Sequence, residues 1–228
     1  HYESGPTMRS SRMAVIDHLV YAVSDLAASI DWLEEATGVR PAIGGSHDGL
    51  GTCNALVSFG ECYLELIAPD PGQPDPPESG LPRPFGLDDV LATDGEGPTL
   101  VGFAVRPEDG ETIDGLADRA ADAGYDPGPV ADMSRLTPAG DRLSWRLTFP
   151  AERTLPFIID WGDTPKPHTT QPGGVELSSF AIVHPRPFDI LGVVAALGLD
   201  ITVTATESND ERTGLRATIT GAGGDLHL

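Results

Sequence analysis

The stretch IDHLVYAVSDLAASIDWLEEATG, residues 16–38, contains two kinds of hydrophobic periodicity, and the prediction of the fold starts from it. Residues 16–23 alternate and are rich in β-branched side chains, which is typical of a strand. Residues 24–38 then repeat apolar side chains at helical spacing, with Ser24 as a capping residue at the start and Gly38 as a terminator. The chain therefore opens with a strand followed by an amphipathic helix.

A short strand near residues 40–46 and a hairpin within residues 47–70 complete this first group of elements. If the turn of the hairpin centres on Gly60 and Glu61, Leu56 lies opposite Glu65 across the two strands. The same register leaves Cys53 and Cys62 several pairs apart, which is too far for a disulfide. We therefore expect both cysteines to be reduced.

The order β-α-β-β-β returns after the proline-dense stretch PDPGQPDPPESGLPRP, residues 69–84. The second copy consists of a predicted strand at 99–105, a helix at 110–125 and strands near 129–135, 142–149 and 155–161. A third, shorter copy begins with a strand at 176–185 and a helix at 188–198. Repetition on this scale constrains the whole chain. The sequence predicts an α+β protein with tandem βαβββ modules at 14–70 and 98–165, a connection at 71–97 and a partial third module at 174–228.

The charge of the chain limits the classes of partner. The formal net charge is -21, and Lys166 is the only lysine, so we expect neither nucleic acid nor an anionic membrane surface as a partner. No apolar run approaches the roughly 20 residues that cross a bilayer. Residues 1–12 lack the apolar core of a signal peptide. We expect residues 1–13 to be a leader outside the fold. These features predict a cytoplasmic protein.

Alternation along the hairpin separates two faces with different chemistry. One face is wholly apolar and is expected to pack against the helices. The other carries Asn54, Tyr63 and Glu65 among apolar residues, as expected of a cavity wall. On the first strand, His18 and the small Ala22 fit the same side. We therefore expect His18 and Glu65 to face each other.

The second copy is interpreted in the same way. Its last strand is expected to turn Phe157, Ile159 and Trp161 toward the helices and Asp160 toward the cavity, as the counterpart of Glu65. Arg135 and Arg146 are expected on the cavity side, where their planar guanidinium groups suit a carboxylate or an enediolate. The alternative is that both arginines pair with nearby acids at the rim.

Taken together, the chain resembles the vicinal oxygen chelate superfamily, and within it the glyoxalase-like domain family. The resemblance covers roughly residues 15–165. It rests on IDHLVYAVSDL (16–26), on the His47–Asn54 run with its GTCN, on FGECYLELIAPD (59–70), and on RLTPAGDRLSWRL (135–147) followed by LPFIIDW (155–161). It implies paired modules that curl into cup-shaped sheets and a pocket for a small molecule. A homodimer is also compatible with it.

The resemblance further implies metal ligands. In metal-using members, the first strand of a module supplies a His and its last strand a Glu, which match His18 and Glu65. These residue types suit Zn, Ni, Mn or Fe(II), whose open positions can polarise a small oxygenated substrate. The implied chemistry is of the isomerase, lyase or dioxygenase type. Glu65 or Asp160 would move a proton, and Asn54, Tyr63, Arg135 and Arg146 would bind the substrate, which the arginines suggest is acidic.

The sequence also departs from the pattern of that family. Leu100 falls where the second module would supply its His, so the set of four ligands is incomplete. His47 would supply a third ligand from its loop, and Asp160 or His168 are further candidates. Without them, His18 and Glu65 would hydrogen-bond to each other in a metal-free pocket. The alternative functions are then a metal-free binding or sequestration protein with Leu56 and Tyr63 in the pocket wall, or a scaffold with a vestigial pocket.

Overall fold

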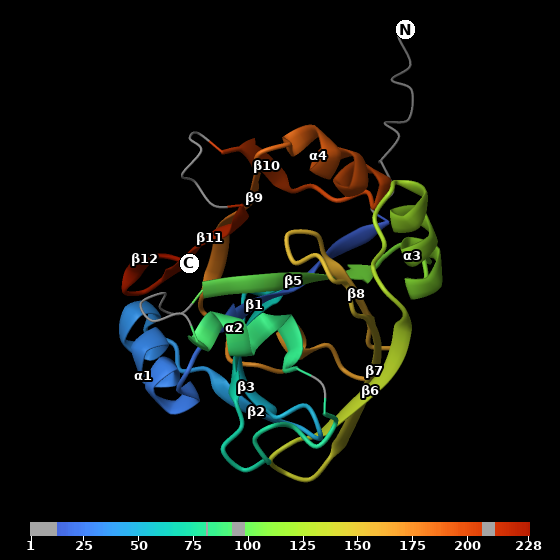
Figure 1. Ribbon diagram of the computed structural model, residues 1–228. Coiled ribbons are helices and arrows are strands. Elements are labelled where there is room, and N and C mark those ends of the chain that lie inside the picture. The colour runs from blue at the N-terminus through green and yellow to red at the C-terminus, as the bar shows by residue number, and fades with distance from the viewer. Residues whose placement is uncertain (1–12, 81, 93–98, 207–212) are drawn as a thin grey trace, which may run out of the picture.

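The computed structural model of the protein describes residues 13–80, 82–92, 99–206 and 213–228 (Figure 1). Most of the predicted leader therefore lies outside the described residues. The elements follow in the order β1 (Ala14–Ala22), α1 (Leu26–Thr37), β2 (Ala42–His47), β3 (Thr52–Ser58), β4 (Tyr63–Pro69), a 3-10 turn η1 (Pro84–Gly86), α2 (Leu87–Ala92), β5 (Thr99–Pro107), α3 (Ile113–Asp122), β6 (Val130–Leu136), β7 (Arg142–Thr148), β8 (Phe157–Asp160), a 3-10 turn η2 (Pro167–Thr169), β9 (Glu176–His184), α4 (Pro187–Ala196), β10 (Thr202–Ala205), β11 (Gly214–Gly221) and β12 (Gly224–His227).

Eight strands form one curved sheet in the order β2-β3-β4-β1-β5-β8-β7-β6. Each half repeats one pattern, because β1 pairs in parallel with β4 and β5 pairs in parallel with β8. The halves join through the antiparallel pair β1–β5. At the far ends of the sheet, Arg135 of β6 donates a hydrogen bond to the carbonyl oxygen of Gly44 on β2, so the sheet is nearly closed. The predicted α+β fold of βαβββ modules is confirmed.

The local signals of the first module act largely as predicted. Gly38 ends α1 with φ of 79°, a left-handed conformation that favours glycine. The N-cap is Asp25 rather than Ser24, because the Asp25 carboxylate accepts a hydrogen bond from the Ala28 amide at 3.0 Å. Leu56 pairs with Glu65 across the hairpin, as predicted.

Both cysteines are free, as the hairpin register predicts. Burial raises the pKa of Cys53 to about 11, and the charge of Asp70 adds to that effect. Burial also raises the pKa of Cys62 to about 12. Both thiols are therefore protonated at neutral pH.

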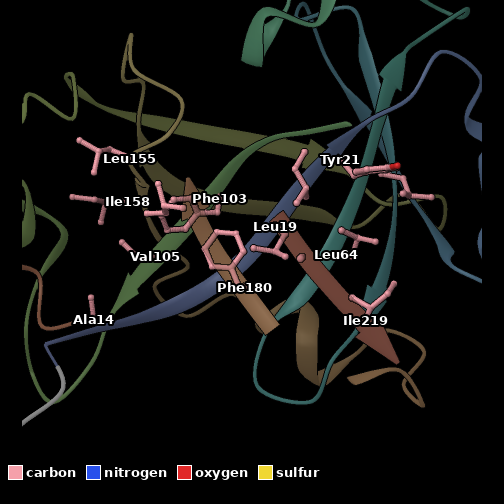
Figure 2. Packing of buried hydrophobic residues seen from close by; sticks show 14 of the residues in the cluster. Ala14, Leu19, Tyr21, Leu64, Phe103, Val105, Leu155, Ile158, Phe180 and Ile219 are labelled. Atoms are coloured by element: carbon pink, nitrogen blue, oxygen red, sulfur yellow. The ribbon is translucent and has the colours of Figure 1, made fainter. Parts of the chain in front are cut away.

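The third segment forms a separate four-stranded sheet in the order β10-β9-β11-β12. It has the element order of a module but a different strand order. Its first strand, β9, pairs in parallel with β10, which directly follows the helix, whereas β1 pairs with the last strand of its module. The small sheet covers the outer face of the large one, where Phe180 of β9 contacts Phe103 of β5 with ring centroids 4.9 Å apart (Figure 2).

Two apolar layers result, one on each face of the large sheet. The outer layer packs the sheet against α1, α3, α4 and the small sheet. The inner layer lies inside the curve of the sheet and combines aromatic and aliphatic side chains from both halves: Val20, Ala22, Leu56, Tyr63, Ile67, Leu87, Val101, Ala104, Trp145, Phe157, Ile159 and Trp161.

The inner layer corrects the predicted faces of the second copy. Phe157, Ile159 and Trp161 point into the curve of the sheet, and Ile158 packs outside it, so the prediction for this strand is wrong. The parallel ladder explains the result, because Phe157 lies beside Ala104 of β5, which is itself an inward residue.

No helix in the described part of the chain is long and apolar enough to span a membrane.

Candidate functional site

A cavity of about 340 Å³ lies inside the curve of the eight-stranded sheet. The first half of the sheet contributes polar side chains to it, namely His18, His47, Asn54, Tyr63 and Glu65. The strands of the second half contribute a mostly apolar wall, with two aromatic side chains and one cation: Val101, Gly102, Met133, Arg135, Trp145, Leu147, Thr148, Phe157 and Ile159.

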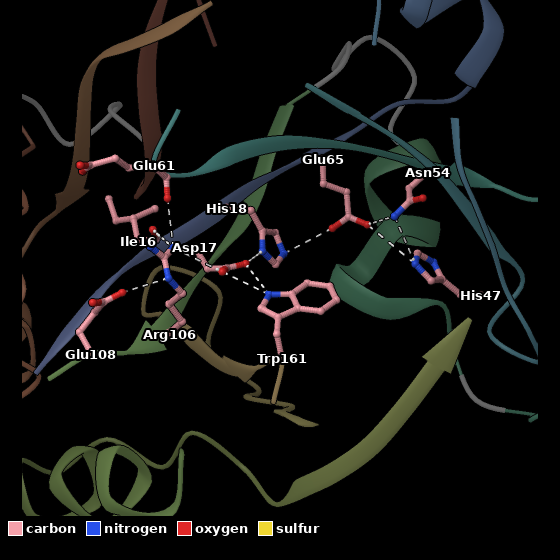
Figure 3. Close-up of polar contacts among 10 residues, drawn as sticks. All are labelled: Ile16, Asp17, His18, His47, Asn54, Glu61, Glu65, Arg106, Glu108 and Trp161. Carbon is pink, nitrogen blue, oxygen red and sulfur yellow. Dashed lines mark hydrogen bonds and ion pairs between the residues drawn. The ribbon is translucent and has the colours of Figure 1, made fainter. Parts of the chain in front are cut away.

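Glu65 is the centre of the polar group, and only 7% of it is exposed (Figure 3). Its Oε1 accepts a hydrogen bond from Asn54 Nδ2 at 2.7 Å. Its Oε2 lies 3.5 Å from Nε2 of His18, and its Oε1 lies 3.9 Å from Nε2 of His47. The prediction that His18 and Glu65 face each other is confirmed, and His47 and Asn54 join them.

Hydrogen-bond partners indicate the tautomer of each histidine. Nδ1 of His18 lies 2.7 Å from Oδ1 of Asp17, and a carboxylate only accepts hydrogen bonds, so Nδ1 carries the proton. Nδ1 of His47 lies 2.9 Å from the hydroxyl of Thr52. The Asn54 amide nitrogen, a donor, lies 3.3 Å from Nε2 of His47, which is therefore the acceptor. In the neutral form of each ring, the Nε2 lone pair faces the cavity.

Electrostatic effects favour neutral His47. Burial lowers the pKa of His47 and Arg135 acts in the same direction, although the charge of Glu65 opposes them.

His18 stacks on Tyr63 with ring centroids 4.6 Å apart, and the edge of Phe157 contacts it at 5.3 Å. The ring of His18 is thus held by packing against Tyr63 and Phe157 as well as by its hydrogen bond with Asp17.

Arg135 lies in the cavity wall, as predicted, with 3% of it exposed. Its Nη1 donates to the Gly44 carbonyl, and its charge interacts with that of Glu65. Burial lowers the pKa of Arg135, whereas Glu65 and Tyr63 raise it. Arg135 is thus a buried cation in the cavity wall whose charge acts on Glu65.

Arg146 and Asp160 lie on the opposite face of the sheet, so the prediction that they face the cavity is wrong. They pair with each other in the β7–β8 ladder. Arg146 contacts both carboxylate oxygens of Asp114 on α3 at 3.2 Å, and Asp160 accepts a hydrogen bond from the Gly162 amide at 2.9 Å. The rim alternative, pairing with a nearby acid, is correct for Arg146.

Two other predicted positions are also absent from the cavity. Leu100, expected at the place of a second His, packs in the outer apolar layer. Across the β1–β5 ladder the residue opposite His18 is Ala104. His168 does not line the cavity either: its carbonyl oxygen accepts a hydrogen bond from Ser58 at 2.7 Å. Strands β5–β8 bring no His, Asp or Glu side chain into the cavity.

Sequence reasoning missed Asp17, which alternation places on the other face of the first strand. Asp17 is fully buried beside His18. Burial raises the pKa of Asp17, but the hydrogen bond with His18, the charges of His18 and Arg106 and the indole of Trp161 together lower it below its ordinary value. The available signal was two consecutive polar residues, Asp17 and His18, in an apolar strand.

The polar group contains the donor types of a metal site, although its side chains are not placed around a common point. In residues 13–80, 82–92, 99–206 and 213–228, no three His, Cys, Asp or Glu side chains are already placed to hold a metal ion. The Asn54 amide nitrogen lies against two of the donors, Glu65 and His47. The chemistry of the set nevertheless fits, because two imidazole lone pairs turn toward one carboxylate. Asn54 is also not fully satisfied where it lies, since its buried Oδ1 has no hydrogen-bond partner.

Several solved structures are similar to this chain. A hypothetical protein from Staphylococcus aureus is similar in structure, with a TM-score of 0.57 at 14% identity over 94% of this chain and 84% of that chain. Methylmalonyl-CoA epimerase from Mycobacterium tuberculosis gives a TM-score of 0.40 at 22% identity, covering 67% of this chain and 90% of that one. A mutant of 4-hydroxymandelate synthase from Streptomyces coelicolor gives 0.46 at 18% identity, covering 95% and 62%.

No curated protein matches the chain. The model of a family described as "Glyoxalase-like domain" matches residues 16–198, which span both modules and the start of the third segment. The resemblance to the vicinal oxygen chelate superfamily is confirmed, and the chain belongs to the glyoxalase-like domain family.

Proposed function

We propose that the protein carries out metal-assisted chemistry on a small oxygenated substrate, with His18, His47 and Glu65 as the metal ligands. One observation carries this proposal: the Nε2 atoms of both histidines point at the Glu65 carboxylate, at 3.5 and 3.9 Å, within one largely apolar cavity. Zn, Ni, Mn or Fe(II) suits these donors, and two histidines with one carboxylate leave positions at which such an ion would polarise two adjacent substrate oxygens.

The surrounding side chains suit an acidic substrate. The buried Arg135 would bind a carboxylate or an oxyanion, because its guanidinium keeps its charge in an apolar wall. Asn54 and Tyr63 would orient the same molecule. Glu65, rather than Asp160, would move a proton, since it is the carboxylate that the strands place in the cavity. The geometry serves isomerase, lyase and dioxygenase-type chemistry equally.

A second candidate function is binding of a small molecule without a metal. The contact of the Asn54 amide with Glu65 and His47 favours it, because this contact gives both residues a partner in the absence of an ion. The aromatic wall from the second half would then provide most of the contact with an apolar ligand.

The metal content of the protein purified without chelator separates the two functions. The wild type, loaded with Zn, Ni or Mn, would be compared with a His18→Ala/Glu65→Gln variant and with an Arg146→Gln/Asp160→Asn variant. The second variant is the matched control, because both of its residues lie outside the cavity. We expect the wild type and the control to retain metal and the first variant to lose it. A wild type that retains no more metal than the first variant would exclude the metal-assisted function.

A further inference from the structure

We propose that Asp17 is a positioning residue, whose carboxylate holds the proton of His18 on Nδ1 and so keeps the Nε2 lone pair directed at Glu65. The inference rests on the proposed function, because that function gives Nε2 of His18 a ligand role. Asp17 itself would contact neither substrate nor ion. It acts through the imidazole, and four observed contacts around it support this role.

A β-bulge brings Asp17 and His18 together. Consecutive residues of a regular strand point to opposite faces of the sheet. The β1–β5 ladder, however, shifts register between Ile16, which pairs with Val105, and His18, which pairs with Ala104. Asp17 is the extra residue at this shift, and its side chain contacts the ring of its own neighbour at 2.7 Å. Bulges often redirect a side chain in this way next to functional sites.

Three donors fix the carboxylate: His18 on β1, Arg106 on β5 and Trp161 directly after β8 (Figure 3). Trp161 Nε1 lies 3.2 Å from each Asp17 oxygen, and Arg106 Nη1 lies 3.5 Å from Oδ2. His18 takes Oδ1. Because the side chain of Asp17 is fully buried, these donors replace the water that an ionised carboxylate would otherwise need.

Arg106 is itself held in place. Its Nη1 also donates to the carbonyl oxygens of Ile16 and Glu61 at 3.1 Å, and its Nε donates to Glu108 at 3.3 Å. The positive group therefore stays on the Oδ2 side of Asp17, opposite His18. The arrangement resembles a carboxylate–histidine pair that orients a metal ligand, in which the partner of the second ring nitrogen fixes the tautomer.

Because Arg106 lies on one side of Asp17 and His18 on the other, the orientation of an amide at position 17 can be predicted. In an Asp17→Asn variant, Arg106 repels the amide NH₂ group and attracts the amide oxygen. The NH₂ group then turns toward His18, whose Nδ1 must accept, so the ring proton moves to Nε2 and faces Glu65. Trp161→Phe is the matched control, because it removes one donor to Asp17 and leaves the carboxylate–imidazole contact unchanged.

The tautomer can be measured directly on metal-free protein with ¹⁵N-labelled histidine. Two-bond ¹H–¹⁵N correlation spectra at mildly alkaline pH distinguish protonated Nδ1 from protonated Nε2, and loss of the signals in His18→Gln assigns them. We expect protonated Nδ1 in the wild type and in Trp161→Phe, and protonated Nε2 in Asp17→Asn. Protonated Nε2 in the wild type, or an unchanged tautomer in Asp17→Asn, would overturn the proposal. If Asp17→Asn does not fold, the wild-type tautomer alone decides.

Zinc binding, measured by competition with a chromophoric chelator, gives the second readout. We expect Asp17→Asn to bind Zn²⁺ about 10- to 100-fold more weakly than the wild type and Trp161→Phe to bind it normally. A wild type that binds no Zn²⁺ but shows the expected tautomers contradicts the proposed function and leaves the positioning role intact. Equal zinc affinity and equal tautomers in the wild type and Asp17→Asn contradict the positioning role alone.

Discussion

The two halves of the large sheet share one pattern of strand pairing but present different chemistry to the cavity between them. Strands β1–β4 present two histidines, an amide and a carboxylate, whereas β5–β8 present aromatic and aliphatic side chains and Arg135. At the centre of the joint, His18 on one half lies opposite Ala104 on the other. Backbone repetition is therefore compatible with different side-chain chemistry in the two halves.

Burial explains why the polar residues are concentrated in one half. A buried carboxylate or imidazole is costly unless other groups pair with it. In the first half, Asp17 of β1 and Thr52 and Asn54 of β3 supply those partners. The strands of the second half bring no His, Asp or Glu side chain into the cavity and need no such partners there. The polar groups that face the cavity from the strands therefore come mainly from the first half, and the second half adds a mostly apolar wall with Arg135.

The largest effect is expected from Phe157→Ala, which tests the packing role of the second half. Phe157 is 4% exposed and contacts His18 and Phe85 with ring centroids 5.3 Å apart. Removal of the ring leaves a cavity, so we expect the free energy of unfolding, measured by urea titration, to fall by about 3–5 kcal/mol. Phe188→Ala, at an 84% exposed position, should leave the urea midpoint unchanged. Equal midpoints for the two variants would show that the second half contributes no packing.

The next effect concerns the carboxylates of the two halves. Glu65→Gln should weaken Zn²⁺ binding about 100-fold or more, because it removes the charged donor that both histidines face. Asp160→Asn makes the same chemical change on the outer face and should leave the affinity unaltered. Competition with a chelator measures both. If Asp160→Asn also weakened binding, the division between the halves would be wrong.

The sequence predicted the first half well because its strands carry a strong contrast between faces. In the hairpin, Asn54 and Glu65 alternate with Ala55 and Leu64, so only one assignment of the faces avoids burying unpaired polar groups. The turn at Gly60 then fixed the register, and the pairing of Leu56 with Glu65 followed.

The second half lacked that contrast. In β8 both sets of alternate residues are mostly apolar, so parity alone left Ile159 and Asp160 open to either face. For Arg146, alternation along β7 does not reveal its partner, because Asp114 on α3 is distant in the sequence. Asp17 was missed for another reason, since a bulge breaks the alternation on which the prediction depended. These failures arise from tertiary contacts and from a bulge, which alternation along a single strand does not record.

A smaller effect is expected from Arg135→Gln, which removes the buried cation from the second half. The change leaves the Gly44 carbonyl without its donor and Glu65 without a nearby positive charge. We expect a loss of about 1–3 kcal/mol in the free energy of unfolding. Arg142→Gln is the control, because Arg142 is exposed and donates only to the Ser134 hydroxyl among the contacts resolved for it. An Arg135→Gln variant as stable as the control would show that Arg135 does not close the sheet.

The smallest effect is expected from Arg146→Gln, and it tests the boundary between the two faces of the second half. Arg146 pairs with Asp114 at the surface, where solvent screens the ion pair and the side chains lose entropy in forming it. We therefore expect an unchanged urea midpoint and unchanged Zn²⁺ affinity, whereas Arg135→Gln lowers the midpoint. If Arg146→Gln altered zinc binding as Glu65→Gln does, the outer face would take part in the site, and the cavity would no longer account for the chemistry alone.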